Sequence, residues 1–244
     1  MTLHKSITLE PAFVIHTQSF RETSIIAILF TRHYGKISVI AKGARRPKSK
    51  LKLIKTPATM FSISSRGKTE LQTLIYCEIM EYFNPLPHSY NFLVYLNELL
   101  TKMFEKEDAH VEVFDQYLNF CRSLGRSDKK GLEANLRLFE DILLIEGGFG
   151  LDFTSEAHSK KRIKEDSTYK FDPVTGFLPL KEPISNKHDH HFRGKDILNF
   201  SKGDLTSSST RQASKEIMRQ ALDFHLGTKK IKIREYLSLK GEQR

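Results

Sequence analysis

The chain has 244 residues, of which 39% are hydrophobic and 28% charged, and its formal net charge is +10. These proportions indicate a globular protein with one large domain or two modest ones, and they exclude a disordered or fibrous chain. The longest apolar run, residues 25–30, is too short to cross a bilayer, and two cysteines are too few for a disulfide framework or a zinc ribbon. The opening MTLHKSITLEPAF has no secretory-signal pattern. We therefore expect a cytoplasmic protein.

The first third of the chain has the pattern of short strands. Five β-rich or alternating runs are separated by turn sequences such as RHYGK and SSRGK. The predicted strands cover residues 12–17, 25–30, 37–41, 60–63 and 69–77. They close most economically into a small barrel of the OB type, because closure leaves no strand edge exposed. We predict an OB-fold domain over residues 1–82.

From NPLP at residues 84–87 onward, apolar residues recur at helical spacing. Predicted helices cover residues 92–104, 113–121 and 132–143, and helical spacing returns at 197–200 and 217–225. The third helix ends at the glycine pair of GGFG, and a hairpin-like DPVTGFLPL follows a polar stretch. The fold class is therefore α+β. An α-helical domain over residues 83–244, with an irregular or hairpin insertion at about 152–192, follows the barrel.

Positive charge is concentrated in one connection of the predicted barrel. Residues 42–55, KGARRPKSKLKLIK, hold seven Lys and Arg and no acid, and residues 1–83 hold 13 Lys and Arg against five Asp and Glu. Such a run is often only a solvated surface, but on a barrel this basic loop could follow nucleic-acid phosphates. The predicted DNA-binding residues are Lys42, Arg45, Arg46, Lys48, Lys50, Lys52 and Lys55, with Arg66 and Lys68 from the SSRGK turn.

Three aromatic residues lie near these cations in sequence. Phe20, Tyr34 and Phe61 could stack on bases without sequence preference. The alternative is that they belong to the barrel core, and we favour that interpretation for Phe61.

No catalytic site is predicted. GKT at residues 67–69 lacks the earlier glycine of a phosphate-binding loop, because position 62 is serine, and a strand follows it rather than a helix. The acidic pairs Glu140/Asp141 and Glu146/Asp152 could form a two-metal nuclease centre, but they lie within or just after an amphipathic helix, where acids normally face water. We expect an activity driven by binding energy alone.

No metal or cofactor is predicted either. His188, His190 and His191 could form a metal tract, but without cysteines or a regularly spaced carboxylate a surface loop is the simpler interpretation. Cys77 continues a strand pattern and Cys121 a helical one, so both are expected in the core.

Several segments together resemble one known family. The run FVIHTQSFRETSIIAILFTRHYGKISVIAKGARRPKSKLK is similar to the N-terminal domain of the bacterial recombination mediator family RecO. YLNELLTKMF resembles that family's first helix after the barrel, LRLFEDILLIEGGFGLDF its central helix and glycine stop, and LGTKKIKIREYL the start of its last helix. The resemblance covers nearly the whole chain.

The resemblance implies an OB fold followed by helices, no catalysis, and annealing of DNA strands. It also implies contact with RecR and with the acidic tail of single-stranded DNA-binding protein (SSB), and help in loading RecA. Some members hold zinc with four cysteines after the central helix, but residues 154–167 have none here, so we expect no zinc and a looser segment. The predicted SSB-tail site is Arg137, Phe139, Ile142 and Phe153. A non-catalytic protein adaptor held on nucleic acid by its basic face is the main alternative, and an OB-containing nuclease is a further one.

Overall fold

The computed structural model describes residues 5–180 and 191–234. The described residues form two compact units, one made of residues 5–132 with 231–234 and the other of residues 133–180 with 191–230. No described helix is long and apolar enough to span a membrane.

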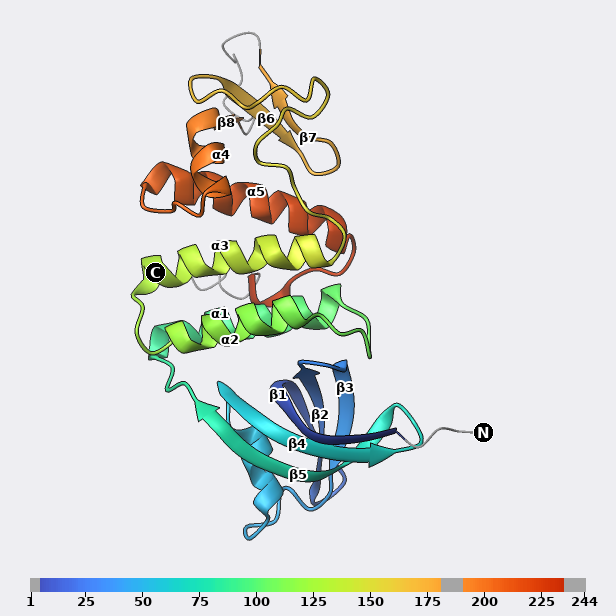
Figure 1. The fold of residues 1–244 in the computed structure, drawn as a ribbon. Coiled ribbons are helices and arrows are strands. Elements are labelled where there is room, and N and C mark those ends of the chain that lie inside the picture. Colours follow the sequence, from blue (N-terminus) through green and yellow to red (C-terminus); the bar gives the residue numbers. More distant parts are fainter. Residues whose placement is uncertain (1–4, 181–190, 235–244) are drawn as a thin grey trace. The chain divides into compact units, whose positions relative to one another are not determined.

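The five predicted strands form a closed barrel (Figure 1). They are β1 (Lys5–Phe20), β2 (Ser24–Thr31), β3 (Gly35–Ala41), β4 (Thr59–Gly67) and β5 (Leu71–Tyr82). The order is β1-β2-β3-β5-β4, and antiparallel pairing of β1 with β4 closes the ring. The pairing of β3 with β5 is parallel and short, from Ser38–Leu71 to Ile40–Thr73. This arrangement confirms an OB-like barrel within an α+β protein.

The barrel interior is filled by residues that alternate along the strands. On β5 the alternation changes phase, because the β4–β5 register shifts between Ser64 and Ser65. As a result Leu74 and Cys77 are buried, while Leu71 and Ile75 are exposed. A strict alternation along the predicted strand 69–77 would place Leu71, Ile75 and Cys77 on one face, which is wrong for this strand, although the core position of Cys77 is confirmed.

Two of the predicted helices pack on the barrel within the first unit. They are α1 (Tyr90–Met103), which follows the short 3-10 helix η2 (Pro87–Ser89), and α2 (Val111–Ser123). Aromatic rings join α2 to the barrel, with the Phe13 centroid 4.7 Å from that of Tyr117 and the Phe30 centroid 5.5 Å from that of Phe114. Gly35 lies at φ +63°, and a Cβ at this position would stand 1.9 Å from the carbonyl oxygen of Asp108. Only glycine fits this approach.

The last described residues also belong to the first unit. Ile231 is buried, and the backbone N–H groups of Lys232 and Ile233 donate to the Glu98 carboxylate of α1 at 2.8 and 3.0 Å. The guanidinium of Arg234 lies 5.2 Å from the centroid of the Tyr95 ring. These contacts hold the chain end against α1.

The second unit contains the rest of α3 (Lys129–Glu146), whose first four residues belong to the first unit, and a small sheet with two helices. The sheet has the order β7-β6-β8, and the helices are α4 and α5. The bounds are β6 (Thr168–Asp172), β7 (Gly176–Pro179), β8 (His191–Arg193), α4 (Gly194–Ser201) and α5 (Ser208–Leu226). The predicted hairpin is confirmed, and the Asp172 carboxylate accepts the N–H groups of Val174 and Thr175 in its turn.

The polar stretch of residues 154–167, which we expected to be loose, is tied by backbone hydrogen bonds. The N–H of Glu156 donates to Lys161 O at 2.8 Å, and the N–H of Ile163 donates to Thr154 O at 2.9 Å. Ile163 is buried. This segment therefore folds without cysteines.

The division of the chain into domains at residues 82 and 83 falls between β5 and η2, where strands give way to helices. It stays a prediction of where one folding unit ends, and limited proteolysis would test it.

Candidate nucleic-acid interface

The basic loop, residues 42–55, connects β3 to β4 and follows a fixed path. Successive turn hydrogen bonds lead into the 3-10 helix η1 (Lys50–Lys55). Ala44 and Ile54 insert into the barrel core with 1% and 0% exposure. The loop is therefore anchored near both ends by apolar burial, and its charged side chains are left on the outside.

All of the predicted loop cations are exposed. They are Lys42, Arg45, Arg46, Lys48, Lys50, Lys52 and Lys55. Arg45 also ties the loop to the β1–β2 turn, because its N–H donates to Thr23 O at 2.9 Å and its guanidinium to Arg21 O at 3.2 Å. Arg66 and Lys68 are exposed as well, but they lie at the end of β4 and in the β4–β5 turn, outside the residues that line the two grooves described below.

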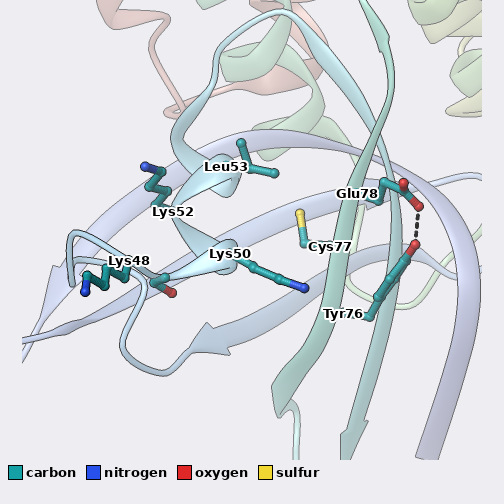
Figure 2. A pocket seen from close by; sticks show the side chains of 8 residues that line it. Lys48, Lys50, Lys52, Leu53, Tyr76, Cys77 and Glu78 are labelled. Carbon is teal, nitrogen blue, oxygen red and sulfur yellow. Dashed lines mark hydrogen bonds between the residues drawn. The ribbon is translucent and has the colours of Figure 1, made fainter.

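One side of the loop forms an open groove with β5 (Figure 2). This β5 groove has a volume of about 410 Å³ and is lined by Lys48, Ser49, Lys50, Lys52, Leu53, Tyr76, Cys77 and Glu78. Figure 2 shows the Lys50 side chain extending from the loop toward β5. The groove thus combines three cations with one exposed aromatic ring.

Tyr76 donates its hydroxyl hydrogen bond to Glu78 on the same strand. This bond raises the pKa of Tyr76 above its ordinary value, which already leaves the phenol neutral at pH 7. Burial raises the pKa of Cys77 to about 12, so its thiol is not a nucleophile. The β5 groove is therefore equipped to bind rather than to react.

The start of the loop, residues 42–46, forms a second groove with the β1–β2 turn. This β1–β2 groove has a volume of about 280 Å³ and is lined by Phe20, Arg21, Thr23, Ser24, Ile40, Lys42, Gly43 and Arg46. The Arg21 guanidinium lies 5.2 Å from the centroid of the Phe20 ring, so the two side chains stack. No acid is among these lining residues, although the exposed Glu22 is next to Arg21 in the turn.

Sequence reasoning missed two residues of these grooves. Arg21 and Tyr76 are separated from the basic loop by 20 or more positions, and only the barrel brings them to it. Because Arg21 directly follows the aromatic Phe20 in a turn, its sequence position could have indicated it as a binding residue. Of the aromatic residues that were considered, Phe20 lines a groove, Tyr34 is exposed in the β2–β3 turn, and Phe61 is buried in the core as favoured.

The predicted SSB-tail residues all lie in the second unit. Phe139 and Phe153 are buried, and Phe153 packs on Phe177 and Phe200 with centroids 5.6 and 4.9 Å away. Ile142 is half-buried. Arg137 keeps only about 10% of its side chain exposed, and its Nη1 lies 2.7 Å from Glu140 Oε2. A tail carboxylate at this site would have to compete with Glu140.

The remaining candidates form no reactive centre among the described residues. No group of three or more His, Cys, Asp and Glu that could hold a metal is found in them. His188 and His190 lie outside the described residues, while His191 belongs to β8. Asp152 accepts hydrogen bonds from the N–H and hydroxyl of Thr154.

Two family models follow each other along the chain and together cover most of it. "Recombination protein O N terminal" covers residues 5–83 and "Recombination protein O C terminal" covers residues 87–235. The chain belongs to the RecO family. Among its relatives, the DNA repair protein RecO of Actinobacillus succinogenes is 36% identical over 229 residues, which are 93% of this chain and 94% of that protein. The DNA repair protein RecO of Haemophilus influenzae strain PittGG is 35% identical over 93% and 94%. That of Pasteurella multocida is 34% identical over 91% of each.

Proposed function

We propose that this protein is a DNA-binding recombination mediator that binds and anneals DNA strands without ATP and without catalysis. The observation that carries the proposal is the basic loop. Seven exposed cations stand on a connection that two buried apolar residues, Ala44 and Ile54, fix to an OB-like barrel. Family membership supports a role in DNA repair and recombination.

The physical basis is charge neutralisation. Complementary strands repel each other through their phosphates, and Lys and Arg that contact phosphates release condensed counterions. A surface that neutralises two backbones close together lowers this repulsion and lets bases pair. The exposed ring of Tyr76 and the half-buried ring of Phe20 line the two grooves together with cations and supply stacking that does not depend on sequence.

The finer partners follow from the family. We propose that the protein contacts RecR and the SSB tail and so helps to load RecA on SSB-coated single strands, acting on the nucleoid in the bacterial cytoplasm. For the SSB tail, Arg137 with Phe139, Ile142 and Phe153 stays the proposed site. Of these residues Ile142 is half-buried and Arg137 keeps about 10% of its side chain exposed, and an apolar side chain with an arginine suits a ligand that ends in an apolar residue and a carboxylate.

One observation favours the adaptor as a second candidate. The outer surface of β5 exposes Ile75, Met80 and Tyr82, which are 55%, 51% and 51% accessible. Exposed apolar side chains grouped on one strand are typical of protein contact sites. The adaptor function would use this surface and keep the basic loop only as a tether to DNA.

A single gel separates these functions. Purified protein is mixed with labelled complementary single strands and Mg²⁺ in the absence of ATP. Annealed duplex is the expected product. Unchanged strands would favour the adaptor, and shortened strands would identify a nuclease.

A further inference from the structure

We propose that the basic loop contributes to two separate single-strand sites. One protein chain would then hold two DNA strands at once, one in the β5 groove and one in the β1–β2 groove. The inference rests on the proposed DNA binding and adds where each strand lies.

The two grooves are separate surfaces of the same compact unit. They have no lining residue in common. The last loop residue of the β1–β2 groove is Arg46 and the first of the β5 groove is Lys48, so only Pro47 stands between them. Cα atoms two positions apart in sequence, such as those of Arg46 and Lys48, are at most about 7 Å apart. The two grooves therefore follow each other directly along the loop, with a single residue between their nearest loop residues.

Each groove has both components of a single-strand site. The β5 groove is lined by Lys48, Lys50 and Lys52 and by Tyr76 of β5, and the Lys50 side chain extends toward that strand (Figure 2). In the β1–β2 groove, Arg21, Lys42 and Arg46 lie beside Phe20. Cations follow the phosphates and a flat ring accepts a base, so each groove is sufficient for one strand.

The grooves differ in charge and in the surface they offer to a base. Glu78 in the β5 groove offsets one of three cations, whereas the residues lining the β1–β2 groove include no acid. The stacked pair of Arg21 and Phe20 offers a cationic plane, and Tyr76 offers a neutral ring. We therefore expect the β1–β2 groove to bind its strand more tightly and with a steeper dependence on salt.

This arrangement is well suited to annealing. Two strands in one continuous groove would exclude each other. Strands in two neighbouring grooves of one basic loop lie close together, and both backbones are neutralised.

The test uses two variants of the full chain that lose equal charge. Lys50→Gln with Lys52→Gln weakens the β5 groove, and Arg21→Gln with Arg46→Gln weakens the β1–β2 groove. Lys161→Gln with Arg162→Gln, exposed in the second unit, is the charge control. The number of short oligothymidine strands bound per chain is measured by sedimentation at low salt, and circular dichroism verifies that each variant is folded.

The wild type and the control are expected to bind two strands per chain, and each groove variant one. Each groove variant should also anneal complementary strands at least tenfold more slowly while it still binds one strand. If the wild type binds only one strand and both variants weaken that binding, the two-site inference is overturned, while the proposed DNA binding still holds. Two strands retained by both variants would overturn the placement of the sites. If the wild type binds no strand at all, the proposed function itself is rejected.

Discussion

Replacing Arg45, Arg46, Lys48 and Lys50 with Ala should weaken single-strand binding and flatten its dependence on salt. All four side chains are exposed, and the anchors Ala44 and Ile54 are untouched, so the barrel should keep its stability. Each lost single-strand phosphate contact removes roughly 0.7 from the slope of log K against log salt, so four contacts remove about 2.8. Between 50 and 200 mM salt, the affinity of the variant should therefore fall roughly 50-fold less than that of the wild type.

Fluorescence anisotropy of a labelled oligonucleotide across a salt series measures these slopes. The matched control replaces Lys161, Arg162, Lys164 and Lys170 with Ala, which removes the same charge from exposed positions in the second unit. The control should keep a slope close to that of the wild type. A loop variant whose slope equals the wild-type slope would refute the reasoning, because the cations would then make no phosphate contacts.

Three further predictions concern the second unit and metal content. Burial raises the pKa of Asp141 to about 6, so its contribution to stability is complete below about pH 4 and is lost as the pH rises through 6. Asp141→Asn should therefore stabilise the fold at pH 8 by up to about 2–3 kcal/mol and change it little at pH 4, measured as urea midpoints; equal effects at both pH values would contradict this. Arg137→Ala, if still folded by circular dichroism, should weaken binding of an SSB-tail peptide by roughly 1–3 kcal/mol in calorimetry, and full-strength binding would reject this site. Elemental analysis should find well below one zinc per chain, because Cys77 and Cys121 are both buried, one in a strand and one in a helix; a stoichiometric zinc would refute this.

The sequence was sufficient to predict the strands and their closure into a barrel, but not the pairing and register by which the barrel closes. Period-2 patterns locate strands because burial alternates along them, and the helical stripes of α1, α2 and α3 follow from period 3.6 in the same way. The parallel pairing of β3 with β5 depends on contacts between residues more than 30 positions apart, such as Ser38 and Leu71, which leave no local pattern. The phase error on β5 has a similar cause, since the bulge opposite Ser64 and Ser65 is set by pairing with another strand.

The residues of the candidate site also differ in how far the sequence could predict them. The loop cations were predictable because they are consecutive in sequence and unopposed by acids. Tyr76 and Arg21 were not, because their positions beside the loop are created only when the barrel closes. For the proposed tail site, which stays a prediction, Arg137 and Phe139 both lie on α3, and the structure adds the ion pair of Arg137 with Glu140.

The measurement that tests the central claim most directly is photo-crosslinking of the full chain to a single strand containing 5-iodouracil, followed by mass spectrometry of the crosslinked peptides. If the basic loop and its two grooves bind DNA, crosslinks should fall on Phe20 and Tyr76 and on peptides from residues 42–55, and competition by unlabelled strands should remove them together. Crosslinks confined to residues 133–230 would contradict the account, since DNA would then be bound by the unit that does not contain the loop.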